Sequence, residues 1–232
     1  MCADLPDYEP CSNLSLLDNG LHHVSFELRR ETPSFFRVGR ECHLVLLRAM
    51  VEALRGSANL DIVGRSKDEF RVTRYRLGDG PWHEIRKEAV PGCRKAWRYS
   101  APKVIPAPTP PRSAKERIFD DYLLGFYELL AKVQTDGFMI RQYGARAAQL
   151  NDSDLGCLEW LHERVRNEFE HFVPKSYAVE VQSLLSGSLV ALRLSHFLLF
   201  ESGAALLLEC PDDLQARLHR LVSALAPLAK QT

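Results

Sequence analysis

The sequence has no excess of charge of either sign, although charged residues are common in it. Its 232 residues include 30 lysines and arginines and 30 aspartates and glutamates. The apolar and charged fractions, 46% and 26%, are those of an ordinary globular protein. This balance excludes a chain that binds nucleic acid through an overall positive charge, and it excludes an acidic disordered chain. Electrostatic binding would have to come from a local concentration of charge.

Metal-site spacings are also missing. The six cysteines lie singly, without a CxxC pair and without the cysteine–histidine spacing of a zinc site. A disulfide framework is not expected in a chain of this size. His22, His23 and His43 have no convincing third ligand, so we interpret them as polar-surface or helix-packing residues. We therefore expect free thiols, no metal and no other cofactor.

An uninterrupted apolar segment of membrane-spanning length is absent. The most apolar run, 184–200, contains Arg193 and His196, and Glu201 follows it. Such groups are rare at the centre of a span of about 20 residues, so we interpret the run as a buried helix or a dimer face. The first residues lack the basic flank and apolar stretch of a signal peptide. We expect a cytoplasmic protein that does not associate with a membrane.

Most of the chain shows the apolar periodicity of helices. Residues recur at spacings of three and four in six segments, with Ser12 or Asn13, Ser34 and Asn151 as candidate N-caps. The predicted helices cover residues 13–31, 34–56, 113–134, 151–173, 176–200 and 212–226. The predicted fold is mainly α: an antiparallel helical bundle, formed by residues 13–57 and 113–226, with a small β-hairpin insertion.

The predicted insertion covers residues 62–100. Runs of β-forming residues, separated by a Gly-Asp-Gly-Pro turn at 78–81, indicate an antiparallel hairpin or a three-stranded flap. Eleven basic residues and only five acidic ones lie between residues 62 and 103. Five prolines fall within residues 101–112, which we predict to be an extended linker without packed structure.

The basic, aromatic composition of the insertion suggests contact with RNA. Lysines and arginines would hold phosphates while aromatic side chains stack on bases. The candidate phosphate contacts are Arg71, Arg74, Arg76, Lys95 and Arg98. In the alternative, which we prefer for the aromatic residues, the insertion is a solvated hairpin whose aromatics pack onto the bundle. Acidic residues on neighbouring helices would then offset its positive charge.

Helix 151–173 carries the residues with the clearest chemistry, Arg166, Asn167 and His171. On an ideal α-helix, at about 100° per residue from Val165 at the centre of the core stripe, Arg166 falls at about 100°, Asn167 at about 200° and His171 at about 240°. Asn167 and His171 are then neighbours at i and i+4, and all three can reach an interface. The alternative is structural: Arg166 would pair with Glu170, and His171 would interact with the helix dipole.

This stretch resembles the signature of the HEPN superfamily of helical domains. That signature is an arginine, usually followed by a polar residue, and then a histidine after four to six intervening residues. Arg166, Asn167 and His171 match the form with four intervening residues, and Phe172 follows. The resemblance implies a four-helix core drawn from residues 13–57 and 113–200, with the flap as an insertion and the last helix as an addition.

The resemblance further implies a metal-independent endoribonuclease that acts as a homodimer, with two copies of the motif facing each other across one cleft. His171 would be the acid or base, Arg166 the phosphate clamp and Asn167 the orienting polar group. Glu52 would assist His171, or would be a solvent-exposed glutamate. A role in toxin–antitoxin or phage-defence systems fits the family, with an antitoxin protein as a partner.

Two other functions remain open at the level of sequence. One is a non-catalytic module that holds a nucleotide or another anion at Arg166. The other is an interaction protein whose bundle and flap dock a protein partner. Cleavage of RNA that depends on His171 would distinguish the enzyme from both.

Overall fold

A computed structural model describes residues 12–55, 63–64, 72–76, 81–93, 97–106, 122–139, 145–167, 178–205 and 213–230, with only the backbone at 63–64, 72–76, 122–123 and 166–167. The helices are α1 (Asn13–Leu28), α2 (Phe35–Arg55), α3 (Phe126–Val133), α4 (Asp136–Met139), α5 (Asp152–Leu161), α7 (Val181–His196) and α8 (Leu214–Leu228). Two π-helical segments, η2 (His162–Asn167) and η3 (Phe197–Glu201), continue α5 and α7. The strands are β1 (Val63–Gly64), β2 (Val72–Arg76), β3 (Trp82–Ala89), β4 (Trp97–Tyr99), β5 (Lys103–Ile105) and β6 (Tyr122–Leu123).

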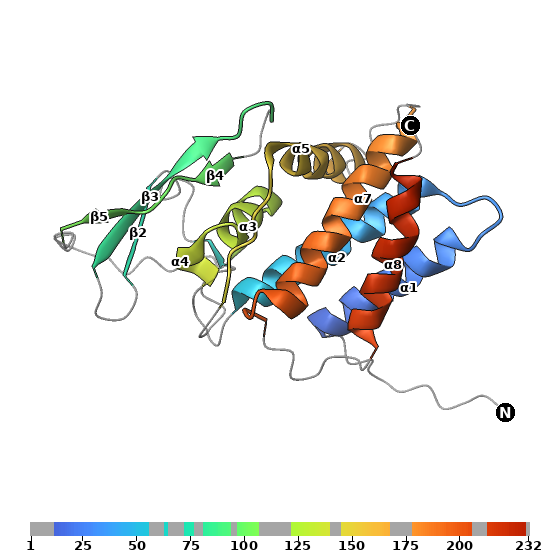
Figure 1. Cartoon of the computed structure of the whole chain (residues 1–232), viewed down its shortest axis with the longest axis horizontal. Coiled ribbons are helices and arrows are strands. Elements are labelled where there is room, and N and C mark those ends of the chain that lie inside the picture. The colour runs from blue at the N-terminus through green and yellow to red at the C-terminus, as the bar shows by residue number, and fades with distance from the viewer. Residues whose placement is uncertain are drawn as a thin grey trace.

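The helices form a bundle with α2 and α7 at its centre. Figure 1 shows α1 and α8 on one side of this central pair and α3 and α4 on the other, with the larger β-sheet beyond them. Glycine allows the central helix to approach its neighbours closely. A Cβ at Gly187 of α7 would lie 3.1 Å from the carbonyl oxygen of Cys157 in α5. A Cβ at Gly39 of α2 would lie 3.0 Å from Cδ2 of Leu184 in α7.

The predicted helical stripes supply the core. Most of the apolar residues on these stripes that the structure describes are less than 10% exposed, among them Leu17, Leu21, Leu46, Met50, Leu158, Leu161, Leu218 and Leu225. Among the described residues, one helical stretch, Val181–Glu201, has the length and apolar composition of a membrane span, and 61% of its 18-residue apolar window is buried within the protein. The expected mainly α fold with a small antiparallel β insertion is confirmed.

Helix α1 begins as its sequence predicts. Ser12 is the N-cap: its hydroxyl oxygen accepts a hydrogen bond from the N–H of Ser15, and the Ser15 hydroxyl oxygen accepts one from the N–H of Ser12. This capping box satisfies two backbone donors that the first helical turn leaves without partners. Buried Glu52 of α2 accepts a hydrogen bond from the Asn13 side chain at 2.7 Å, which ties the start of α1 to α2. The expectation of a solvent-exposed Glu52 is therefore wrong.

The turn between α1 and α2 is organised by the carboxylate of Glu27, which is only 5% exposed. Its Oε1 accepts the N–H of Ser34 at 2.7 Å, and Arg30 donates to both of its oxygens. Arg37 of α2 lies 3.8 Å away from Oε2. The hydrogen bond from Ser34, together with Arg30 and Arg37, lowers the pKa of Glu27 below its ordinary value of 4.5, although desolvation opposes the shift.

Glu27→Gln should therefore destabilise the fold in a pH-dependent manner. A carboxyl group whose pKa is lowered by folding adds stability above its unfolded pKa and loses that contribution as the pH falls. We expect a lower midpoint of thermal unfolding for Glu27→Gln at pH 7, and a difference from wild type that shrinks as the pH falls below about 4.5. Exposed Glu31 provides the control, since Glu31→Gln should match wild type. A constant difference between pH 7 and pH 3 would contradict this role.

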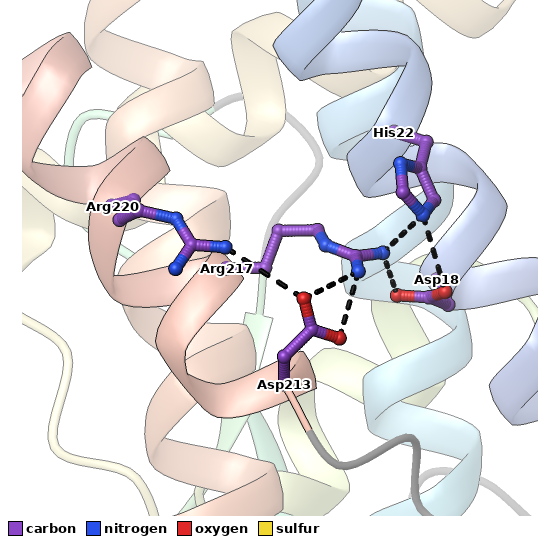
Figure 2. A network of polar contacts seen from close by, with 5 residues as sticks. All are labelled: Asp18, His22, Asp213, Arg217 and Arg220. Atoms are coloured by element: carbon purple, nitrogen blue, oxygen red, sulfur yellow. Dashed lines mark hydrogen bonds and ion pairs between the residues drawn. The ribbon is translucent and has the colours of Figure 1, made fainter.

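The last helix, α8, is clamped to α1 by a polar network at the surface. Figure 2 shows the guanidinium of Arg217 lying between Asp213 of its own helix end and Asp18 and His22 of α1. Two hydrogen bonds, of 2.7 and 2.8 Å, join Arg217 to Asp213. They lower the pKa of Asp213, and Arg220 adds a weaker contact at 3.8 Å.

The β insertion is larger than a hairpin. Strand β3 pairs antiparallel with β2 on one edge and with β4 and β5 in succession on the other, and β1 pairs separately with β6. We call β2, β3, β4 and β5 the flap. Ser100 continues the second edge, because its N–H donates to the Arg86 carbonyl oxygen at 2.7 Å.

Two predictions about residues 101–134 are corrected. Residues 101–112 were expected to lack packed structure, but Lys103–Ile105 forms β5 against β3. Helix 113–134 was expected to be continuous, but Tyr122–Leu123 is strand β6, and α3 begins only after Gly125. The apolar spacing there fits a helix, yet pairing with β1 prevails, since local propensity yields to tertiary contacts. Residues 107–121 lie outside the described part of the chain.

Candidate functional site

The helix that carries the predicted motif begins at a well-formed cap. The Asn151 side chain accepts the N–H of Asp154 at 2.8 Å, as its sequence predicts. Asp152 and Asp154 place negative charge in the first turn, where it interacts favourably with the helix dipole. Leu155 and Leu158 face the core without measurable exposure. The start and inner face of this helix are therefore fixed by local sequence.

The second half of the helix departs from α-helical geometry. His162–Asn167 forms η2, in which hydrogen bonds run from i to i+5 and each turn contains more residues. The placement of Arg166 and Asn167 at about 100° per residue is therefore wrong, because it assumed an α-helix. Val165 still reaches the core, with 2% exposure. The side chains of Arg166 and Asn167 and the whole of His171 lie outside the described part of the chain.

A buried histidine holds this segment against the bundle. Nδ1 of His162 lies 2.9 Å from Nε2 of His43 in α2, in hydrogen-bonding contact, and the two residues are 4% and 2% exposed. The Phe126 ring of α3 stacks on His162 with centroids 4.3 Å apart and planes 12° apart. Next to it, the Tyr127 hydroxyl donates to Oε1 of Glu163 at 2.8 Å. Three elements distant in sequence thus meet at the first two residues of η2.

The geometry of the histidine pair restricts its protonation. One of the two facing nitrogens must carry the shared proton and the other must accept it. At most one of the two rings can therefore be an imidazolium ion while this hydrogen bond exists. The prediction that His43 is a helix-packing residue is confirmed. No role for His162 was predicted from the sequence, although its position three residues before Val165 places it beside the core stripe.

Burial disfavours ionisation of one tyrosine and three cysteines in this part of the bundle. Desolvation, reinforced by the hydrogen bond to Glu163, raises the pKa of Tyr127 well above its ordinary range. Desolvation also raises the pKa values of Cys93 and Cys157. The nearby carboxylate of Glu159 adds to the increase at Cys93. Burial raises the pKa of Cys42 to about 12. Because the thiolate is the reactive form, these three cysteines are poor nucleophiles at neutral pH.

The flap lies against the beginning of the motif helix. Nη1 of Arg98 in β4 lies 3.4 Å from Oδ1 of Asp152. A Cβ at Gly156 would be 4.0 Å from the sulfur of Cys93, in the turn between β3 and β4. Since Asp152 and Arg166 are separated by 14 residues, the two ends of this helix are about 20 Å apart. An RNA strand that contacted both would have to extend over about six stacked nucleotides.

Of the candidate phosphate contacts, the structure describes one side chain. Arg98 is partly exposed and paired with Asp152, so an acidic residue of a neighbouring helix partly offsets its charge, as the alternative interpretation expects. Arg74 and Arg76 lie on β2, where only the backbone is described, and Arg71 and Lys95 lie outside the described residues.

The aromatic residue Tyr99 packs inward as the alternative interpretation predicts. It is 8% exposed, and its ring lies 5.4 Å from that of Phe138 in α4. Trp97 meets it edge-on at 5.1 Å, and the Lys87 ammonium lies 3.7 Å from the Trp97 ring centroid. Lys87 also approaches Glu128 of α3 at 3.7 Å. These contacts dock the flap on α3 and α4 and occupy its side chains there.

No metal centre is found in the part of the chain that the structure describes, where no three histidine, cysteine, aspartate or glutamate side chains are grouped to hold an ion. Comparisons of the chain with protein-family models, with curated proteins and with solved structures find no match.

The contribution of the histidine pair can be measured with a double-mutant cycle. His43→Leu or His162→Leu alone removes one partner from a buried hydrogen bond, which should lower the free energy of unfolding by about 1–3 kcal/mol. The double variant should lose less than the sum of the single variants, since each single change already breaks the shared contact. Urea unfolding at pH 7 gives these values, with exposed His219→Leu as the control. Strict additivity would show that the two rings are not energetically coupled.

Proposed function

We propose that the chain is a HEPN-like, metal-independent endoribonuclease in which Arg166, Asn167 and His171 act on RNA. The observation that carries the proposal is the π-helical segment His162–Asn167, which includes the first two motif residues. π-Helical turns are rare and occur frequently at functional sites. The motif therefore coincides with a local departure from regular structure, inside a mainly helical bundle of the kind that the resemblance implies.

The buried contacts that hold the beginning of η2 against the bundle support the same proposal. A phosphate clamp contributes to catalysis only if it is held in place before the substrate arrives. The buried contacts of His162 with His43 and Phe126 fix the beginning of η2 against α2 and α3. Arg166 follows only four residues later. The backbone that carries Arg166 and Asn167 thus extends from an anchored point of the core.

The proposed chemistry uses only side chains of this protein. The ribose 2′-oxygen attacks the adjacent phosphorus and the bond to the 5′-oxygen breaks, which yields a 2′,3′-cyclic phosphate and a 5′-hydroxyl. His171 accepts the proton of the 2′-hydroxyl or protonates the leaving 5′-oxygen. Arg166 binds the phosphate through paired N–H groups and offsets its growing negative charge, while Asn167 orients the phosphate or the imidazole.

We further propose that the active form is a cytoplasmic homodimer with two motifs across one cleft. Regulation by an antitoxin protein, in a toxin–antitoxin or phage-defence system, is part of the same proposal. The alternative is a non-catalytic module that binds a nucleotide or a protein partner with the same fold.

Cleavage of mixed RNA in EDTA tests the enzyme directly. Wild type should produce fragments with 2′,3′-cyclic phosphate ends. His171→Ala should lower the rate by about 10²–10⁴-fold, the usual contribution of a general acid or base. Arg166→Ala should also lose most of the activity. Circular dichroism of each variant would establish that the fold is unchanged.

Matched controls separate the motif from nonspecific charge effects. His219→Ala and Arg40→Ala change exposed residues on α8 and α2 and should cleave like wild type. Cleavage by His171→Ala at the wild-type rate would overturn the proposal. Absence of cleavage by all forms, with nucleotide binding that is lost in Arg166→Ala, would establish the non-catalytic module instead.

A further inference from the structure

A cavity of binding-site size lies near the beginning of the motif helix, at the end opposite Arg166. It has a volume of about 700 Å³, within the range of small-molecule pockets. Its walls come from the 145–150 segment, the starts of α4 and α5, the second half of α7 and the first residue of η3. We call it the α5–α7 pocket.

The interior of the α5–α7 pocket is mainly apolar. Val190, Leu194 and Phe197 line it along one face of α7 and η3, and Ala148 and Leu150 face them from the 145–150 segment. A backbone hydrogen bond fixes the position of that segment, because the N–H of Ala148 donates to the Val133 carbonyl oxygen at 2.8 Å. The apolar surface is therefore built by fixed elements of the fold.

Two arginines stand at the η3 end of the pocket. The backbone N–H of Arg146 donates to the carbonyl oxygen of Ser202. The Arg146 guanidinium donates to the carbonyl oxygen of Glu201 at 2.9 Å. It also lies 5.7 Å from the centroid of the Phe197 ring. Arg193 lies one helical turn before Phe197 and is exposed. Within the described part of the chain, the guanidinium of Arg193 makes no hydrogen bond or ion pair, although its backbone carbonyl accepts the N–H of Phe197. Its positive charge is thus available to a ligand.

The acidic residues of the rim give the pocket polarity. Asp154 belongs to the first turn of α5, and α5 meets α7 near Gly187, one turn before Val190. Arg146 lies beside Phe197 of η3, on the wall that α7 and η3 form. Asp136 adds a second carboxylate from the start of α4. A ligand with one anionic group would place it at the arginines rather than at either carboxylate.

We propose that the α5–α7 pocket binds a small organic anion with an apolar body. Arg193 and Arg146 receive the carboxylate or another anionic head, and Phe197, Leu194 and Val190 cover the apolar part. The charge of Arg193 and the aromatic face of Phe197 lie on adjacent turns, so head and body can be held together. This site is separate from Arg166 and does not depend on the proposed ribonuclease activity.

A fluorescent probe tests the site on the full-length protein. 8-Anilino-1-naphthalenesulfonate combines an aromatic body with one sulfonate, and its emission rises in an apolar pocket. We expect saturable binding to the native protein and about tenfold weaker binding to Arg193→Gln. Arg40→Gln, which removes another exposed arginine without a partner in the described chain, should bind like wild type. Equal weakening in both variants, or none in either, would overturn the proposal.

Competition and a blocked pocket complete the test. Decanoate and 4-phenylbutyrate should displace the probe, whereas decylamine and decanol should not. The relative potency of decanoate and 4-phenylbutyrate shows whether the pocket prefers an aliphatic or an aromatic ligand. Val190→Trp should fill the pocket and abolish saturable binding, with a wild-type circular dichroism spectrum as the check of folding. Unchanged binding to a folded Val190→Trp variant would place the probe elsewhere and refute the assignment.

Discussion

The hydrogen bond between His43 and His162 is the contact on which the proposed active region depends. Both rings are buried, so a ring nitrogen left without a hydrogen-bond partner would lower the free energy of unfolding. Satisfying them requires that η2 lie close to α2 at one register. The stack of Phe126 on His162 sets the position of α3 relative to the same point. A polar pair thus specifies an arrangement that apolar packing alone would define less sharply.

This anchor divides the motif helix into two halves. Its first half borders the flap and the α5–α7 pocket, through Asp152 and Asp154. Its second half carries Arg166 and Asn167 on the π-helical segment. The fixed point at His162 lies between them. We infer that binding of RNA at one end and of a small anion at the other would involve separate surfaces of one rigid element.

Much of the bundle follows from local sequence patterns. The apolar spacing and the Ser12 and Asn151 caps predict α1 and α5, because capping and burial of one face act within a few residues. The short strands were harder to predict. Tyr122–Leu123 has helical spacing, and its strand state depends on β1, which lies about 60 residues earlier. The pairing of β5 with β3 likewise overrides a proline-rich composition.

The candidate site was predictable only in part. The spacing of Arg166, Asn167 and His171 is visible in the sequence, and so is the start of their helix. The partner of His162 is 119 residues away, which no local pattern reveals. The π-helical segment has no sequence signal that distinguishes it from the α-helix before it. Both features arise from tertiary packing, and both bear on how the motif is presented.

Hydrogen–deuterium exchange of the backbone amides tests most directly whether the buried histidine pair holds the motif segment in place. Wild type and His43→Leu would be compared at pH 7 under conditions in which both remain folded. The account predicts faster exchange in residues 158–167 of the variant, while α1 and α8 exchange at the wild-type rate. Unchanged exchange in residues 158–167, or an equal increase throughout the bundle, would contradict it.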